Sequence, residues 1–371
     1  MKVCMDIQAA LGQQAGVGRY VRELVKHLGP LAGEDELSAF FFDFQRRGLD
    51  FRPEGVALRG CRWLPGRVAQ AAWKRLGWPP FDWLAGGADV YHFPNFICPP
   101  LSRGKRSVVT IHDVSFLRHP ETTEAKNLAW LRAQIHRTAQ RADAIITDSD
   151  FSAGEIVELL RVPAEKMHPI WLGLTPFPEP ASAENPAARA GVAGKYLLTV
   201  GTIEPRKNLP FLVKVFEGLA DEDLWLVIAG NWGWKTEDAR RAIEESPRRE
   251  RIVVLPGLDD ASLGQVYAGA AAFVFPTLYE GFGFPPLEAM SQGVPVVAAR
   301  NSSLPEVLGE AAMWVEGYEA GVWAAAVQRV VAGGEGVAAL RAAGRERAGG
   351  FTWGEVAGRT WEVYRRVAAG G

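Results

Sequence analysis

Cysteine is scarce in this chain, and long apolar runs are missing from it. The 371 residues include three cysteines, Cys4, Cys61 and Cys98, too few and too scattered for a disulfide framework or a zinc cluster. We therefore expect a reducing, cytoplasmic compartment. The segment 1–7 is interrupted by Asp6 and is too short for a signal peptide. Because no stretch of about 18 apolar residues occurs, we expect no membrane-spanning helix.

An excess of charge of one sign is also lacking. The chain has 41 lysines and arginines against 43 aspartates and glutamates, so no global field attracts nucleic acid, and we expect no nucleic-acid partner. Its hydrophobic content of 48% is ordinary for a globular protein. At roughly 150 residues per domain the length predicts two or three domains, and two large domains fit best.

Short apolar runs alternate with helical patterns along the chain, which is the spacing of βαβ units. The predicted strands of the first half are 2–7, 39–42, 90–92, 108–111 and 144–147. Those of the second half are 196–200, 224–229, 252–255, 271–275, 294–298 and 313–315. The sequence therefore predicts an α/β fold with two parallel sheets.

A segment rich in proline and alanine separates the two halves. Residues 176–192 contain four prolines and few bulky apolar residues, which is typical of a linker. We expect a first domain over 1–175, a second domain over 193–353, and a closing helix over 354–371 that belongs with the first domain.

Two glutamates, Glu280 and Glu288, flank the most informative segment, 281–287 (GFGFPPL). Glu280 follows the predicted strand 271–275, at the strand end where ligands bind open α/β sheets. We expect Pro286 at the first position of the next helix and Glu288 in its first turn. One carboxylate can then accept hydrogen bonds from sugar hydroxyls and the other from a ribose diol. The alternative is a solvated loop residue and a carboxylate that complements the helix dipole.

Two cations, Arg206 and Lys207, follow the predicted strand 196–200 and precede a helix whose start is marked by Asn208 and Pro210. A cation pair beside a helix amino end suits a diphosphate and stabilises its charge as it leaves. The alternative is a solvated basic pair.

A histidine, His112, ends the predicted strand 108–111, with Asp113 beside it as an orienting or structural residue. It is a candidate for the active site, and a satisfied core histidine is the alternative. Gly16 and Gly18 follow the first strand, where they form either a phosphate-approach loop or a tight turn.

The triplet 148–150 (DSD) has the form of an Asp-x-Asp metal signature. It directly precedes a predicted capping box at 152–155, so helix entry explains it better. We expect no metal site there.

A basic stretch with interleaved tryptophans lies in the first half. Residues 46–75 hold eight basic and two acidic residues, and four tryptophans occur within 46–83. Such a segment can hold a protein at an anionic membrane surface, where a lipid-linked acceptor is found. The alternative is an ordinary helix with solvated loops.

Six segments, taken in order, resemble the retaining glycosyltransferases of family 4, and most of all the mannosyltransferase-like members of group 1. They are 16–20 (GVGRY), 110–113 (TIHD), 201–208 (GTIEPRKN), 279–288 (YEGFGFPPLE), 301–306 (NSSLPE) and 351–353 (FTW). The resemblance spans nearly the whole chain. It implies the GT-B fold, in which two Rossmann-like domains face each other across a cleft and the closing helix crosses back onto the first domain.

The resemblance implies a role for each motif. The loop with Gly16 and Gly18 closes over the donor diphosphate, and His112 hydrogen-bonds the donor sugar near its anomeric carbon. Arg206 and Lys207 hold the diphosphate. Backbone amides contact the sugar or the phosphate at Phe282, Gly283 and Phe284.

One position departs from the family pattern. Some members have an arginine directly after the glycine that ends the strand, where this chain has Thr202. Whether one or two side chains contact the diphosphate is therefore open.

The implied activity is the transfer of a hexose from a nucleotide sugar, with retention, to a glycan or lipid-linked acceptor in O-antigen or exopolysaccharide synthesis. GDP-mannose is the first choice of donor and a UDP-sugar such as UDP-glucose the second. The family needs no metal or other cofactor, and the enzyme would be cytoplasmic, with peripheral attachment to the inner face of the plasma membrane.

Two functions of other classes compete with transfer. A nucleotide-sugar epimerase of GT-B shape would convert the donor without an acceptor, and the spacing of Glu280 and Glu288 argues against it. A catalytically silent nucleotide-sugar-binding subunit would not need His112, Arg206 and Lys207 together with both glutamates.

Overall fold

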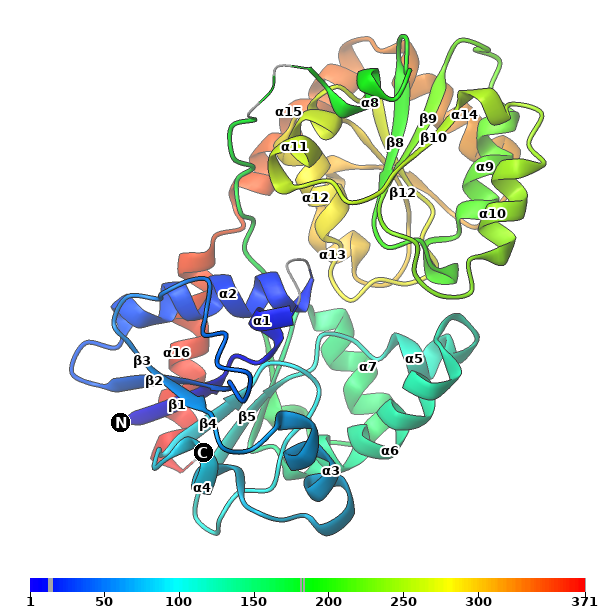
Figure 1. Cartoon of the computed structure of the whole chain (residues 1–371). Helices are drawn as coiled ribbons and strands as arrows, with labels where there is room; N and C mark the ends of the chain where they lie inside the picture. The colour runs from blue at the N-terminus through cyan, green and yellow to red at the C-terminus, as the bar shows by residue number, and fades with distance from the viewer. Residues whose placement is uncertain (13–15, 181, 183, 371) are drawn as a thin grey trace. The chain divides into compact units, whose positions relative to one another are not determined.

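The computed structural model describes residues 1–12, 16–180, 182 and 184–370, and the chain folds as two units (Figure 1). The first unit comprises Met1–Val114, Ala129–Gly173 and the chain end from Thr352, and the second comprises Ser115–Leu128 and Leu174–Phe351. The short segment Ser115–Leu128, which precedes the expected linker, thus groups with the second unit.

The first unit is built on a parallel sheet that has seven strands among the described residues. The strands are β1 (Lys2–Asp6), β2 (Glu36–Phe42), β3 (Val56–Cys61), β4 (Val90–Phe93), β5 (Arg106–Thr110), β6 (Ala144–Thr147) and β7 (Met167–Pro169). Their order in the sheet is β3-β2-β1-β4-β5-β6-β7. The parallel α/β sheet is confirmed, but the sequence prediction missed β3 and β7. Strand β3 is half exposed and β7 has three residues, so neither forms an apolar run.

The second unit has a parallel sheet with six strands in the part of the chain that is described. They are β8 (Tyr196–Val200), β9 (Trp225–Ala229), β10 (Ile252–Leu255), β11 (Ala272–Phe275), β12 (Val296–Ala299) and β13 (Met313–Val315). Their order is β10-β9-β8-β11-β12-β13. Every strand predicted for this half is confirmed to within two residues, because each is a short apolar run. Strands β8, β9, β11 and β12 are buried along most or all of their length.

Helices cover both faces of the second sheet. Figure 1 shows α9 (Leu209–Glu217), α10 (Glu237–Glu244) and α14 (Ala320–Ala332) on one side. The helices α11 (Asp260–Ala268), α12 (Phe284–Ser291) and α15 (Glu335–Gly349) lie on the other. Fully buried Phe216 and Trp323 anchor the core beneath α9 and α14. Truncating either to alanine would cost about 3–5 kcal/mol.

The end of the chain returns to the first unit. Helix α16 (Trp353–Ala369) packs on α2 (Val17–Leu28) and contacts β5. Its buried face includes Trp361 and Tyr364, as the helical spacing predicts. The crossing-back of the closing helix is therefore confirmed.

The remaining helices are short or connect these layers. They are α1 (Ala9–Gly12), α3 (Gly66–Leu76), α4 (Phe81–Ala85), α5 (Ser115–Arg118), α6 (Ala125–Arg141), α7 (Asp150–Leu160), α8 (Pro186–Arg189) and α13 (Leu304–Leu308).

Two predicted helix starts are wrong. Helix α7 begins at Asp150, and its N-cap Ser149 accepts a hydrogen bond from the Ser152 amide at 3.1 Å, so the cap lies three residues before the expected one. Helix α12 begins at Phe284, which places Glu288 in its second turn. A first helical turn tolerates proline beyond its first position because its amides have no intrahelical partner.

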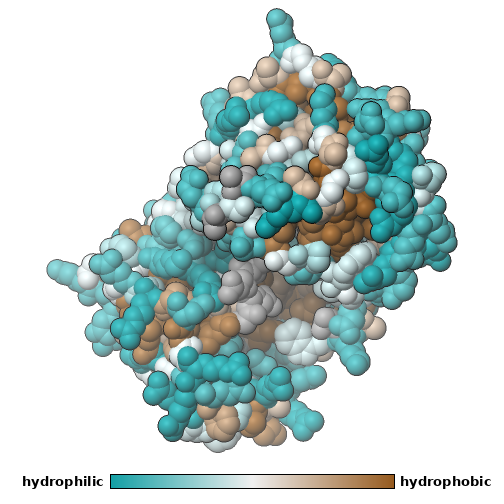
Figure 2. Space-filling model, turned by 45° about the horizontal axis from the view of Figure 1, so that its top comes forward, coloured by the Kyte–Doolittle hydropathy of each residue, from teal (hydrophilic) through white to brown (hydrophobic). Residues whose placement is uncertain are grey.

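The surface carries most of the polar residues. The face in Figure 2 is mostly hydrophilic, with separate hydrophobic patches between the hydrophilic residues. None of the helices in the described residues is long and apolar enough to cross a bilayer.

Candidate functional site

The residues of the second unit that the sequence singles out meet at one point of its sheet. Strands β8 and β11 are neighbours, with Leu197 opposite Ala272, although β9 and β10 lie between them in sequence. The strand order reverses there, and the loops after β8 and β11 diverge from the same edge. Such a switch point is where open α/β sheets bind ligands. Arg206 and Lys207 follow β8, and Glu280 follows β11.

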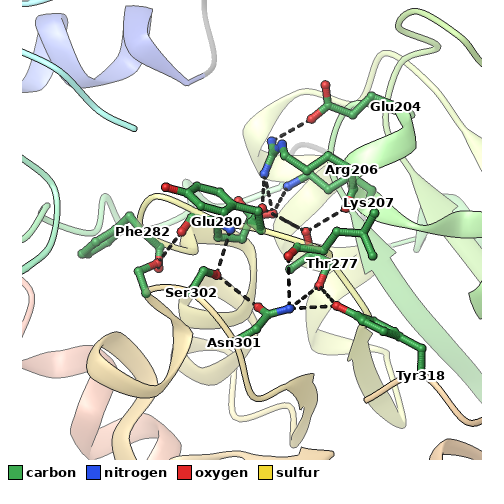
Figure 3. A network of polar contacts seen from close by, with 12 residues as sticks. Glu204, Arg206, Lys207, Thr277, Glu280, Phe282, Asn301, Ser302 and Tyr318 are labelled. Atoms are coloured by element: carbon green, nitrogen blue, oxygen red, sulfur yellow. Dashed lines mark hydrogen bonds and ion pairs between the residues drawn. The ribbon is translucent and has the colours of Figure 1, made fainter. Parts of the chain in front are cut away.

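The carboxylate of Glu280 is held by both cations (Figure 3). Its Oε1 lies 2.7 Å from Lys207 Nζ and 2.8 Å from Arg206 Nη1, and it accepts a hydrogen bond from Thr277 Oγ1 at 2.8 Å. The other oxygen, Oε2, makes no hydrogen bond or ion pair that the described residues show. One oxygen of Glu280 therefore takes all three contacts.

Burial and charge act in opposite directions on this cluster. Burial alone would raise the pKa of Glu280, but Arg206 and Lys207 outweigh it and lower that pKa to about 2. Burial lowers the pKa of Lys207, and the adjacent Glu280 only partly offsets this effect. Glu280 is 7% exposed and the Lys207 side chain 11%, so the solvated alternatives are wrong for both residues.

Arg206 joins a second carboxylate to the cluster. Its Nη2 donates to Glu204 Oε1 at 2.7 Å, and its Nη1 donates to the carbonyl oxygen of Tyr279 at 2.6 Å. Two buried glutamates and two partly buried cations therefore form one group. The sequence predicts that the cations and Glu280 contact different parts of a ligand. The structure pairs them with each other, so a diphosphate would have to compete with Glu280 for the cations.

A second polar layer fixes the loop that carries Glu280. The backbone amide of Glu280 donates to Ser302 Oγ at 2.9 Å, and Ser303 Oγ donates to the Glu280 carbonyl oxygen at 2.9 Å. Asn301 Nδ2 and Tyr318 Oη both donate to the Thr277 carbonyl, at 2.9 and 2.8 Å (Figure 3). The segment 301–306 belongs to the family resemblance, but its residues gave no sign that they brace this loop.

The turn into α12 requires its glycine. Gly283 has a φ of 107°, which favours glycine, and a Cβ there would lie 2.6 Å from Leu304 Cδ2. It is the N-cap of α12, so Phe284 is the first residue of the first turn. The Phe282 ring packs edge-on against Phe284, with ring centres 5.3 Å apart. Ligand contact by these backbone amides stays a prediction.

Glu288 is buried on α12 and accepts a hydrogen bond from Tyr267 Oη of α11 at 2.9 Å. The sequence gives no sign of a role for Tyr267, because a tyrosine within a helix does not reveal such a contact. A ribose contact by Glu288 stays a prediction, now with Tyr267 as its orienting partner.

His112 lies in the first unit, two residues beyond β5, with both ring nitrogens beside acceptors. Its Nδ1 lies 2.9 Å from Asp148 Oδ2, and its Nε2 lies 3.2 Å from the carbonyl oxygen of Pro94. Only the doubly protonated ring satisfies both. Accordingly, although burial opposes it, Asp148 raises the pKa of His112 above its usual value.

The partner that the structure shows for His112 is Asp148, which the sequence explains as part of a helix entry. The sequence predicts an orienting or structural role for Asp113, and the structural alternative stays a prediction. Strands β5 and β6 are neighbours, so the residues that follow them meet at one sheet edge. Among the described residues, no three His, Cys, Asp or Glu side chains are placed to hold a metal ion.

The glycine motif of the first unit is partly described. Gly16 is the exposed N-cap residue of α2, with a φ of 57°, and Gly18 is buried in that helix. The residues 13–15 between α1 and Gly16 lie outside the described residues. Contact of this loop with a diphosphate stays a prediction.

Two family models match most of the chain. Residues 15–173 match the family described as glycosyl transferase 4-like domain, and residues 185–347 match glycosyl transferases group 1. O-antigen chain mannosyltransferase B of Escherichia coli is 33% identical over 336 residues, which are 84% of this chain and 86% of that protein.

Solved structures with low sequence identity share the fold. Sucrose-phosphate synthase from Thermosynechococcus elongatus matches with a TM-score of 0.74 and 19% identity over 100% of both chains. HepE of Anabaena, in complex with UDP and glucose, matches with a TM-score of 0.70 and 15% identity over 99% of this chain and 100% of its own. The two sheets and the returning helix are those of the GT-B fold, and the chain belongs to the group 1 glycosyltransferases of family 4.

Proposed function

We propose that this glycosyltransferase moves mannose from GDP-mannose, with retention of configuration, to a growing lipid-linked glycan in cell-surface polysaccharide synthesis. The observation that carries the proposal is the buried group of Arg206, Lys207 and Glu280 at the β8–β11 switch point. The choice of mannose and of the pathway is supported by the similarity to an O-antigen chain mannosyltransferase. A UDP-sugar donor is the second candidate, because the structurally similar HepE is in complex with UDP and glucose.

The charges suggest how the donor is held. Arg206 and Lys207 stabilise the diphosphate as it leaves, and they do so in a site from which water is largely excluded. Glu280 keeps them in place before the donor arrives, and its Oε2 accepts hydrogen bonds from the hydroxyls of the transferred sugar. Glu288 accepts hydrogen bonds from the ribose. Since the two cations supply positive charge, the transfer needs no metal.

The chemical step is a front-face displacement. The bond from the anomeric carbon to the diphosphate oxygen breaks while the bond to the acceptor oxygen forms on the same face. The acceptor proton passes to the departing phosphate oxygen, so no protein nucleophile takes part. His112, held as an imidazolium, donates a hydrogen bond near the anomeric carbon, exchanging its Nε2 contact with Pro94 for one to the donor sugar.

Peripheral membrane attachment is the second part of the proposal. Trp63, Trp78 and Trp83 are 69%, 57% and 63% exposed, and they flank α3, which carries exposed Arg67 and Arg75. Exposed indoles among cations suit the interface of an anionic bilayer. The expected result is co-sedimentation with vesicles containing phosphatidylglycerol but not with neutral vesicles. Equal binding to both would contradict the electrostatic part.

The transfer is tested by product analysis. Membrane lipid extract is incubated with radiolabelled GDP-mannose or UDP-glucose, and the product is treated with α- and β-mannosidase. The proposal expects label in a lipid-linked product from GDP-mannose that only α-mannosidase releases. A product from UDP-glucose would show that the donor is a UDP-sugar. Conversion of the donor without an acceptor would favour an epimerase.

A further inference from the structure

The first sheet has a switch point of its own, and a cavity lies there. Strand β1 has β2 on one side and β4 on the other, so the loops after β1 and β4 diverge. A cavity of about 390 Å³ is lined by Asp6 at the end of β1, by Phe93 at the end of β4, and by α3 and α6. All of its lining residues belong to the first unit. None of the residues assigned to the donor is among them.

A partly buried carboxylate with spare hydrogen-bonding capacity faces this cavity. Asp6 Oδ1 accepts from the Gln8 amide at 2.9 Å, while Oδ2 has no partner among the described residues. Burial raises the pKa of Asp6 to about 6. The side-chain oxygen of Gln8 accepts from the Phe42 amide at 2.8 Å, which turns its NH₂ group away from β2. That NH₂ group likewise has no partner in the part of the chain described.

Aromatic rings supply the apolar wall of the cavity. Trp73 of α3 is fixed by a hydrogen bond from its indole nitrogen to the Pro79 carbonyl at 2.7 Å and by ring contact with Phe81. Trp130 of α6 is 42% exposed. An indole face with nearby carboxylate and amide groups matches a sugar, which has an apolar C–H face and a rim of hydroxyls.

The cavity borders the histidine of the same unit. Pro94, whose carbonyl oxygen is 3.2 Å from His112 Nε2, lines it. Phe96, whose ring centre lies 5.8 Å from that of His112, lines it as well. A ligand in the cavity is therefore separated from His112 by one layer of residues.

We propose that this cavity binds a sugar unit of the acceptor glycan, with Asp6 accepting a hydrogen bond from one hydroxyl and Gln8 donating to another. The inference rests on the proposed transferase function and names the acceptor side that the donor site leaves undefined. Three exposed cations, Lys74, Arg137 and Arg141, also line the cavity, so inorganic phosphate serves as the rival, anionic probe. Asp6 and Gln8 are positioning residues for the acceptor and take no part in the donor site.

The test measures sugar binding to the full chain without nucleotide. Methyl α-D-mannoside, methyl α-D-glucoside, methyl α-D-galactoside and inorganic phosphate are the probes, followed by saturation-transfer NMR. We expect the wild type to bind at least one glycoside, and Asp6→Ala to bind it about tenfold more weakly, since a hydrogen bond to a charged group is lost. Asp6→Asn keeps an acceptor oxygen and should lose less.

The matched control is Asp43→Ala. Asp43 follows β2 at the same sheet edge, but its carboxylate pairs with Arg62 and lies outside this cavity. We expect unchanged sugar binding in this variant and unchanged GDP binding in all variants. Thermal unfolding checks that each variant is folded.

Each outcome has one meaning. No glycoside binding to the wild type, binding of phosphate alone, or equal affinity in the wild type and Asp6→Ala would overturn the inference. If the wild type binds a glycoside through Asp6 but binds neither GDP nor UDP, the donor proposal fails and the cavity assignment stands.

Discussion

The switch points of the two sheets share a topology and differ in chemistry. At β8–β11 the side chains satisfy each other, because Arg206, Lys207 and Glu280 form a compact, buried group of opposite charges. At β1–β4 the Asp6 carboxylate keeps one oxygen without a described partner and lines a cavity. The fold thus decides where a ligand can bind, and the side chains decide which ligand. We therefore propose a diphosphate as the partner of the cations at β8–β11, and a sugar hydroxyl as the partner of Asp6 at β1–β4.

The largest effect is expected from Lys207→Ala. In the proposed function, the variant removes one of the two charges that stabilise the leaving diphosphate, and we expect kcat to fall about 100- to 1,000-fold. Arg206 still pairs with Glu280, so the unfolding temperature should change little. Lys214→Ala, on the exposed face of α9, is the matched control. Near-normal turnover in Lys207→Ala would contradict a diphosphate site at β8–β11, and with it the proposed difference between the two switch points.

The ion pairs of Glu280 at β8–β11 should make a pH-dependent contribution to the free energy of unfolding. Its folded pKa of about 2 lies below the usual 4.5, so the contribution is present above pH 4.5 and is lost as the pH falls toward 2. The shift corresponds to about 3 kcal/mol. Urea unfolding should show Glu280→Gln less stable than the wild type at pH 7, with a smaller gap at pH 3.5. A gap that does not depend on pH would show that the ion pairs are not its source.

His112, which lies close to the β1–β4 switch point, should lose its charge more easily in Asp148→Asn. Asp148 raises the pKa of His112, so the charged ring stabilises the fold below the unfolded value of 6.5, and this is lost as the pH rises through the higher folded value. We expect the imidazole titration, followed by NMR, to move to lower pH in Asp148→Asn, with about tenfold slower transfer. Asp113→Asn is the control and should shift the titration less. An equal shift in both variants would show that Asp113 orients His112 as much as Asp148 does.

The smallest effect is expected at the ribose end of the donor site. Glu288→Ala should weaken GDP binding about tenfold with kcat little changed, because the contact is made equally before and during transfer. Tyr267→Phe removes the hydrogen bond that orients Glu288. It should weaken GDP binding as well, but by a smaller factor than Glu288→Ala does. Unchanged dissociation constants in both variants would count against a ribose contact.

The sequence predicted the sheets well, because buried parallel strands are apolar runs. It did not predict the exposed strand β3. It also did not predict side-chain contacts between residues that are far apart in the sequence. Lys207 and Glu280 are 73 residues apart, and His112 and Asp148 are 36 apart, so their pairing depends on which strands are neighbours. Local patterns explained Asp148 by the helix that follows it, and they gave Asp6 no role beyond interrupting an apolar segment. Pair formation and cavities arise from packing, which no single segment encodes.

Calorimetry can test whether Arg206 and Lys207 form a metal-independent diphosphate site at β8–β11. GDP-mannose, UDP-glucose and the free nucleotides are titrated into the wild type and Lys207→Ala, with and without EDTA. We predict GDP-selective binding that EDTA leaves unchanged and that Lys207→Ala weakens at least tenfold. Loss of binding in EDTA, or equal affinity in the wild type and Lys207→Ala, would contradict it. Binding of no nucleotide by the folded protein would favour a silent subunit.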